Sequence, residues 1–127
     1  MKSVTLKFNY EFSRVYKRGA FFTGKYLSIH SFRRFPGIKH NLTPIPANIV
    51  RVGFCANKKQ LGAVGRNRAR RLMRESYRRL EYLIPEGYDL VFTLKTKSEV
   101  PSYHDIERDM IKGLKSLGFR VTDEDPV

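Results

Sequence analysis

The sequence predicts an α+β fold, in which helices cover one face of a small β-sheet as a two-layer α/β sandwich. Segments with helical periodicity alternate with short strand-like segments, in the order helix, three strands, helix, strand, helix. At 127 residues the chain is long enough for one domain with a single core. Hydrophobic residues make up 41% of the chain, which excludes a fully disordered basic tail.

The N-terminal part is expected to form a short helix followed by two strands. Asn9 is the predicted N-cap of a helix over residues 10–18, and Gly19 is its predicted C′ residue. Short strands are predicted over residues 20–23 and 25–32.

Alternation within the second of these strands separates two faces. Leu27 and Ile29 are expected to face the core, whereas His30 points to the opposite side. Residues 33–48 contain three prolines and show no periodicity. We therefore predict a loop there and assign no site to it.

The C-terminal half repeats the alternation of strands and helices. A strand over residues 49–56 precedes a basic helix that begins at Gly62 and continues to about Leu83, where Pro85 stops it. An apolar strand follows over residues 88–95.

A final amphipathic helix closes the predicted domain. Ser102 and Asp105 have the spacing of a capping box, and Gly118 ends the helix. The domain is expected to span residues 1–121, and residues 122–127, which carry three acids, to form a flexible tail.

The basic helix is the most informative segment. Residues 66–79 hold seven arginines and one acid, Glu75, or +6 of the formal net charge of +13. At about 100° per residue, Ala69, Leu72 and Met73 begin an apolar arc, and Arg70, Arg71 and Arg74 lie together on another. Such density of charge needs an anionic partner, most commonly nucleic acid, because self-repulsion otherwise destabilises the fold. A solvated basic face is the alternative, but solvated faces usually mix acids with bases.

The sequence contains no pattern typical of a protein catalyst. The twelve acids are dispersed, and the three histidines fall on different segments without metal-ligand spacing. We therefore predict no catalytic and no metal-ligating residue. Cys55 is a lone cysteine and is expected to be a small strand residue. No apolar run approaches a membrane span and no signal peptide opens the chain, so we expect a cytoplasmic protein.

Two strings of residues resemble the signature of the bacterial ribonuclease P protein subunit. That family has a strand ending in two lysines, then a helix start of the form Ala-Val-x-Arg-Asn-Arg, then a basic pair and Arg-Glu. This chain has Phe54-Cys55-Ala56-Asn57-Lys58-Lys59 and then Ala63-Val64-Gly65-Arg66-Asn67-Arg68-Ala69-Arg70-Arg71-Leu72-Met73-Arg74-Glu75. The family more often has serine at position 57, lysine at 70 and a larger residue at 65.

The resemblance implies a four-stranded sheet with three helices and a left-handed strand–helix–strand crossover, as in some ribosomal proteins. It also implies a protein subunit of ribonuclease P, an endoribonuclease of tRNA 5′ maturation, whose active site and Mg²⁺ ions are carried mainly by the RNA subunit. The implied partners are the ribonuclease P RNA and precursor tRNA. The expected RNA-binding residues are Lys58, Lys59, Arg66, Asn67, Arg68, Arg70, Arg71 and Arg74.

Aromatic residues of the first helix supply a second expected site. In the family the equivalent positions border a cleft that holds the single-stranded 5′ leader of precursor tRNA, so the resemblance assigns Phe12, Tyr16 and His30 to that cleft. Exposed aromatic rings are stacking platforms for unpaired bases. Core packing is the alternative for each of these residues. A ribosomal or other structural RNA-binding protein is the alternative for the whole chain, because charge and size suit it equally.

Overall fold

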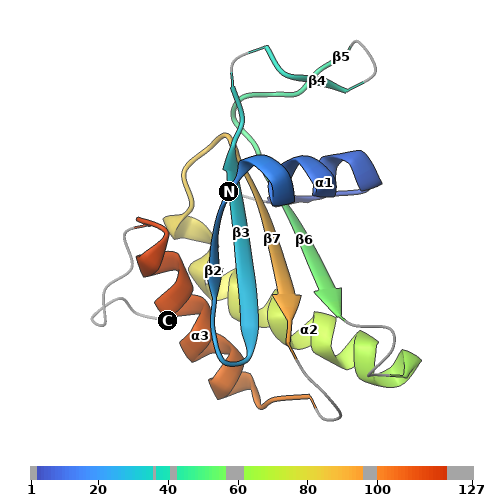
Figure 1. The fold of residues 1–127 in the computed structure, drawn as a ribbon, viewed down its shortest axis with the longest axis vertical. Coiled ribbons are helices and arrows are strands. Elements are labelled where there is room, and N and C mark those ends of the chain that lie inside the picture. Colours follow the sequence, from blue (N-terminus) through green and yellow to red (C-terminus); the bar gives the residue numbers. More distant parts are fainter. Residues whose placement is uncertain (1–2, 36, 41–42, 57–61, 96–99, 120–127) are drawn as a thin grey trace.

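The computed structural model describes residues 3–35, 37–40, 43–56, 62–95 and 100–119 (Figure 1). A five-stranded mixed sheet lies at its centre, with helices against both of its faces. The sheet strands, in spatial order, are β1 (Ser3–Thr5), β6 (Val50–Ala56), β7 (Tyr88–Leu94), β3 (Leu27–Arg33) and β2 (Ala20–Thr23). The helices are α1 (Asn9–Arg18), α2 (Ala63–Leu80) and α3 (Tyr103–Ser116), and a 3-10 turn, η1 (Glu81–Leu83), extends α2.

Strand β7 is the middle strand and joins the two halves of the sheet. It pairs in parallel with β6 and antiparallel with β3, while β1 pairs in parallel with β6 and β2 forms a hairpin with β3. Helix α2 connects β6 to β7 behind the sheet in Figure 1, and β7 lies to the left of β6 while both strands run downward. The crossover is therefore left-handed, as the family resemblance implies, although such connections are right-handed in about 98% of cases.

Alternation along the strands divides the core into two clusters. Leu27, Ile29, Leu90 and Phe92 face α2 and α3 and belong to the larger cluster. On the other face, Val15 of α1 packs in a smaller cluster with residues that include Leu6, Phe32, Ile38 and Val91.

The α+β class and its three helices agree with the prediction, but two details differ. The sheet has five strands rather than four, because residues 3–5 form an edge strand too short to show periodicity. In addition, α1 covers the second face, so the helices do not share one side. The run from residue 90 to 94 signals this burial, since strands that are covered on both faces read as continuous apolar runs.

Smaller differences concern the loop and the ends of the helices. Residues 33–48 include a two-stranded ribbon of β4 (Lys39–His40) and β5 (Thr43–Pro44). Phe8, not Asn9, is the N-cap of α1, and the Glu11 carboxylate accepts the backbone N–H groups of Lys7 and Phe8. The Ser102 hydroxyl does accept the Asp105 N–H at 3.2 Å, and Gly118 ends the last helix with φ +94°.

Gly19 ends α1 for a different reason from the one predicted. Its φ of −85° is not left-handed, so the usual C′ geometry is absent at this residue. Instead, a Cβ at this position would lie 2.2 Å from the Ser31 carbonyl oxygen and 2.6 Å from that of Val15. Only glycine allows the chain to turn this tightly from the helix into β2.

Candidate nucleic-acid interface

Helix α2 presents the arginine face that its periodicity predicts. Ala69, Met73, Ser76, Tyr77 and Leu80 are buried against the sheet and α3. The opposite side is exposed along most of the helix and carries Arg68, Arg71, Arg74 and Arg78. Burial of one side therefore leaves the guanidinium groups of the other side facing solvent.

Few acidic groups neutralise this face. Arg71 lies 4.0 Å from Glu75, the single acid of α2, and both side chains are at least half exposed. An exposed pair of this kind contributes at most about 1 kcal/mol. Arg70 donates to the Asn67 side-chain oxygen at 3.3 Å, and Arg79 is held by Tyr103 and Glu107 of α3. The face thus keeps a large net positive charge that an anion would neutralise.

Six of the eight predicted RNA-binding residues lie on this helix. Arg66 and Asn67 are the fourth and fifth residues of the helix, and the others follow along the same element at positions 68, 70, 71 and 74. Lys58 and Lys59 lie outside the described residues. The structure adds Arg78, one turn beyond Arg74, to the arginines that face outward.

An aromatic patch, formed by Tyr16, Phe21 and His30, lies on the α1 face of the sheet. The His30 ring meets Tyr16 edge-on at 4.8 Å between centroids and stacks on Phe21 at 5.8 Å. Tyr16 is 43% exposed and Phe21 is 67% exposed. Two rings are therefore open to a ligand, while His30 lies between them.

Phe21 was not predicted as a site residue, because only the register of the folded sheet brings it to the patch. Strand β2 places Phe21 directly opposite His30 in the antiparallel register, so both side chains emerge on one face. The sequence does not reveal this register, because the short strand over residues 20–23 shows no polar alternation.

Phe12 shares the face but has a different environment. Its ring packs so closely on Gly53 of β6 that a Cβ there would lie 2.4 Å from Cε1. Phe12 also packs against the smaller core cluster. Phe12 therefore packs beside the patch, and Tyr16 and His30 lie in contact within it, while the assignment of these three residues to a leader-binding cleft stays a prediction.

Burial shifts the pKa values of the titratable groups in and around the patch. Burial lowers the pKa of His30 below its usual value of 6.5, so the ring is neutral at pH 7. His30 Nδ1 is buried without a hydrogen-bond partner among the described residues. Burial raises the pKa of the neighbouring Cys55 thiol and of the Tyr16 phenol. The thiol is thus protonated and unreactive, which fits the expectation of a small strand residue.

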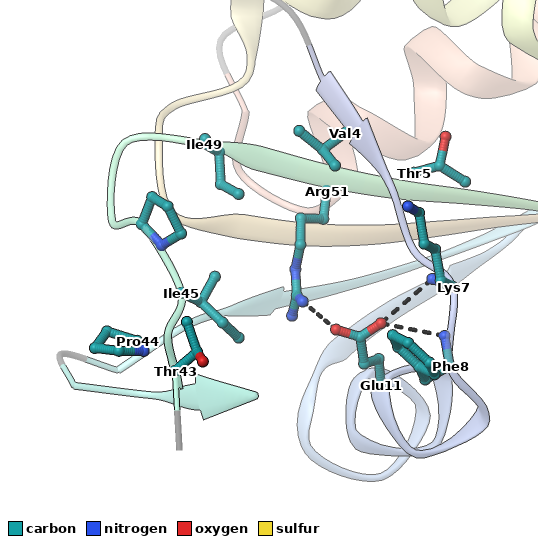
Figure 2. Close-up of a pocket in the computed structure, with 11 residues that line it drawn as sticks. Val4, Thr5, Lys7, Phe8, Glu11, Thr43, Pro44, Ile45, Ile49 and Arg51 are labelled. Carbon is teal, nitrogen blue, oxygen red and sulfur yellow. Dashed lines mark hydrogen bonds and ion pairs between the residues drawn. The ribbon is translucent and has the colours of Figure 1, made fainter. Parts of the chain in front are cut away.

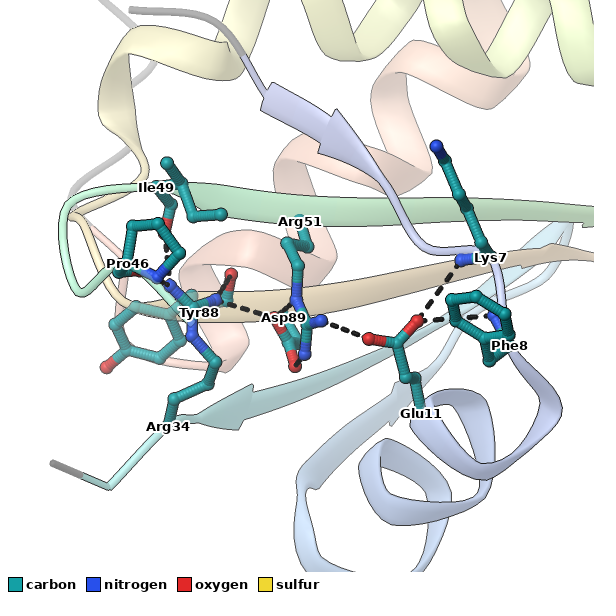
Figure 3. A network of polar contacts seen from close by, with 9 residues as sticks. All are labelled: Lys7, Phe8, Glu11, Arg34, Pro46, Ile49, Arg51, Tyr88 and Asp89. Atoms are coloured by element: carbon teal, nitrogen blue, oxygen red, sulfur yellow. Dashed lines mark hydrogen bonds and ion pairs between the residues drawn. The ribbon is translucent and has the colours of Figure 1, made fainter. Parts of the chain in front are cut away.

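A buried ionic network fixes α1 against the sheet (Figure 3). Asp89 of β7 accepts hydrogen bonds from Arg34 at 2.6 Å and from Arg51 at 2.7 and 2.9 Å. Arg51 also donates to Glu11 of α1, whose other oxygen caps the start of that helix. Burial would lower the pKa of Arg51, but Asp89 and Glu11 raise it. The helix that carries Tyr16 is thereby tied to the central strands.

A cavity of about 290 Å³ lies beside this network, at the start of α1 (Figure 2). Its wall comes from β1, from the turn into α1 and from residues 43–49, and it is mainly apolar. Phe8 and Val4 are each more than 40% exposed at its mouth.

Neither a metal cluster nor a membrane span occurs in the described part of the chain. Within those residues, no three His, Cys, Asp or Glu side chains are grouped so that they could hold a metal ion. The described helices are too short or too polar to cross a membrane.

Comparisons with known proteins identify the family and agree with this fold. A protein-family model described as Ribonuclease P matches residues 1–118. The ribonuclease P protein component of Natranaerobius thermophilus is 36% identical over 109 residues, covering 86% of this chain and 85% of that protein. The component from Clostridium botulinum (strain Loch Maree) is 35% identical over 120 residues, covering 94% of this chain and 98% of that protein.

Solved structures show the same fold at lower identity. The RNase P protein of Staphylococcus aureus superposes with a TM-score of 0.73 at 21% identity, covering 92% of this chain and 97% of that one. The protein from Thermotoga maritima gives a TM-score of 0.66 at 21% identity, covering 92% and 96%. With the family model and these relatives in agreement, the chain belongs to the ribonuclease P protein family, the protein component of that enzyme.

Proposed function

We propose that this chain is the non-catalytic subunit of ribonuclease P, which binds the catalytic RNA and assists removal of the 5′ leader from precursor tRNA in the cytoplasm. The observation that carries the proposal is the arginine face of α2, with seven arginines and one acid on a helix whose other side is buried. Family membership supports the role in tRNA processing. The alternative of a structural RNA-binding protein has no support from these relatives.

The arginine face suits the phosphate backbone of a folded RNA. A guanidinium group binds two phosphate oxygens at once, and each neutralised phosphate releases counterions. Exposed Arg68, Arg71 and Arg74 lie on successive turns, so one run of backbone can contact all three. Asn67 adds a neutral amide for a sugar or phosphate contact.

We assign the Mg²⁺ ions of the reaction mainly to the RNA subunit. Bound there, Mg²⁺ would activate water and stabilise the charge of the leaving oxygen. The chemistry of this chain's surface supports the assignment, because a surface rich in arginine repels divalent cations and attracts the phosphates that bind them. The contribution of this chain is then to reduce repulsion between the two RNA molecules.

The aromatic patch is proposed to hold the leader. Tyr16 and Phe21 offer exposed rings beside a neutral His30, and unpaired bases stack on such rings. Mature tRNA lacks the leader, so contacts at the patch favour substrate over product. Phe12 supports the patch by packing on Gly53.

A cleavage assay tests the catalytic part of the proposal. Precursor tRNA is incubated at low Mg²⁺ with the chain alone, with a bacterial ribonuclease P RNA alone, and with both. We expect efficient cleavage only in the combined reaction. Cleavage by the chain alone would refute a non-catalytic role, and an unchanged rate on adding the chain would refute assistance.

Binding of two tRNA forms tests the leader contact. Tyr16→Ala combined with Phe21→Ala is expected to weaken binding of precursor tRNA to the assembled enzyme about tenfold or more, because stacking contributes roughly 1–3 kcal/mol per base. Mature tRNA should bind as before. Tyr82→Ala is the matched control, since Tyr82 is 58% exposed at the end of α2, away from the patch. An equal loss for both tRNA forms would exclude a leader contact.

A further inference from the structure

A second cavity lies between the edge strand β1 and helix α2, outside the aromatic patch. Its volume is about 500 Å³, larger than the cavity beside α1. Ser3, Thr5, Phe54, Arg70, Arg74 and Arg78 contribute to its lining. We call it the β1–α2 groove.

One wall of the groove is cationic. Arg70, Arg74 and Arg78 are spaced four residues apart, so their side chains follow one side of α2. The groove also contains Glu81, but its carboxylate accepts the Ser3 backbone N–H at 2.8 Å. Three guanidinium groups therefore face one carboxylate that already has a partner, and the groove favours an anion.

The floor of the groove is aromatic. Phe54 is half-buried, stacks on Phe92 at 5.5 Å between centroids and meets Tyr77 at 5.9 Å, so the core holds its ring in place. The Arg74 guanidinium carbon lies 5.9 Å from the centre of the Phe54 ring. This guanidinium lies over the ring, as in a cation–π contact, and its outer face is a planar surface on which a base can stack.

Hydroxyl groups complete the lining at the strand side. The Ser3 hydroxyl and the Tyr77 phenol share a hydrogen bond of 2.7 Å. Thr5 follows on the same face of β1 and is exposed. Each of these groups can accept or donate to a sugar or to the edge of a base.

We propose that the β1–α2 groove binds one unstacked nucleotide of the ribonuclease P RNA, with its base stacked on the Arg74 guanidinium that covers Phe54 and its phosphates on Arg70 and Arg78. The inference rests on the proposed function and adds to it a pocket that recognises a single base. A phosphate ion alone would use only the charge of the cationic wall, whereas a nucleotide would also use the planar surface of the Arg74–Phe54 pair. An acidic peptide would match the cationic wall but gain less from the floor.

A substitution that fills the groove separates this pocket from the general charge of α2. Thr5→Tyr adds a ring at a residue that lines both the groove and the cavity beside α1, and it leaves every arginine in place. Val4→Tyr is the matched control, because Val4 is the adjacent residue of β1, is 43% exposed, and lines the other cavity instead. Far-ultraviolet circular dichroism and thermal melting check that both variants fold.

We expect Thr5→Tyr to weaken binding of the ribonuclease P RNA about tenfold, as expected for loss of one stacked base. Val4→Tyr should bind like the unmodified chain. Unchanged affinity in folded Thr5→Tyr, or an equal loss in both variants, would overturn the proposal. Failure of the unmodified chain to bind this RNA would instead refute the proposed function.

Titration with a free nucleotide tests the groove even if the unmodified chain does not bind this RNA, and it needs no variant. Adenosine 5′-monophosphate, inorganic phosphate and adenosine are titrated separately against the unmodified chain, and amide shifts of Thr5, Phe54 and Arg74 are followed by NMR. We expect saturable shifts with the nucleotide and much smaller shifts with phosphate or adenosine. Equal shifts with phosphate would show that the groove binds anions without recognising a base, and this result would overturn the proposal. Displacement of the nucleotide by an oligoglutamate peptide at lower concentration would assign the groove to a protein partner.

Discussion

Replacement of Asp89 by asparagine tests the role of the buried ionic network. The Asp89 side chain is fully buried and accepts three hydrogen bonds from the side chains of Arg34 and Arg51. Two of these bonds end on Oδ1, which the asparagine oxygen can keep. The third ends on Oδ2, where the asparagine NH₂ group would face the Arg51 NH2 group, donor against donor.

The expected loss of stability follows from these contacts. Removing one partner of a buried ion pair typically costs about 3–5 kcal/mol. Here both arginines keep other acceptors, since Arg51 still reaches Glu11 and Arg34 still donates to the carbonyls of Ile49 and Tyr88. We therefore expect a loss of about 3 kcal/mol in the free energy of unfolding, or roughly 10 °C in Tm for a domain of this size.

Urea unfolding followed by circular dichroism measures this loss, with Glu86→Gln as the matched control. Glu86 is an exposed carboxylate three residues before Asp89, so its neutralisation removes the same charge without touching the network. The control should change stability by less than about 0.5 kcal/mol. A loss below about 1 kcal/mol for Asp89→Asn would show that the network does not hold the sheet and α1 together.

Three further predictions concern the surface, the patch and its packing. Replacing Arg66, Arg68 and Arg71 by alanine should leave the fold intact. It should reduce the slope of log affinity for ribonuclease P RNA against log salt by about 2–3, because each lost phosphate contact lowers that slope by roughly 0.7–0.9. An unchanged slope would show that this face does not contact the RNA. Burial lowers the pKa of His30, so its contribution to stability is complete above about pH 6.5 and is lost as the pH falls below that value. Unfolding measured at pH 7.5 and pH 5 should therefore show a smaller pH-dependent loss in His30→Gln than in the unmodified chain, and equal losses would contradict the assignment. Gly53→Ala should displace the Phe12 ring, because the new Cβ would lie 2.4 Å from Cε1, and should lower Tm by several degrees, whereas Gly62→Ala, with open space around it, should not.

Much of the fold was predictable because its longest elements carry strong periodic patterns. In α2 the apolar arc places Ala69 and Met73 in the core, and both are fully buried. Alternation likewise assigned Leu27 and Ile29 to the core side of β3. The edge strand β1 was missed because three residues show no period, and its partner β6 is remote in the sequence.

The candidate site was predictable only where one element carries it. The arginines of α2 share a helix face, so spacing alone brings them together. The aromatic patch combines α1, β2 and β3, and its composition depends on the register that sets Phe21 opposite His30. The β1–α2 groove is lined in part by β1, which the sequence did not predict, so the groove could not be predicted either.

The central place of β7 determines when this chain can fold. The strand is the middle one of the sheet, yet it is the last one to be synthesised. Until residue 94 has left the ribosome, the β1–β6 pair and the β2–β3 hairpin have no strand between them, and the buried network lacks Asp89. The sheet must then assemble late and cooperatively, by pairing segments that are distant in sequence, which slows folding. A nascent chain that ends before Tyr88 thus has two strand pairs with no strand to join them into one sheet, while its arginine-rich segment has already been synthesised and can meet RNA.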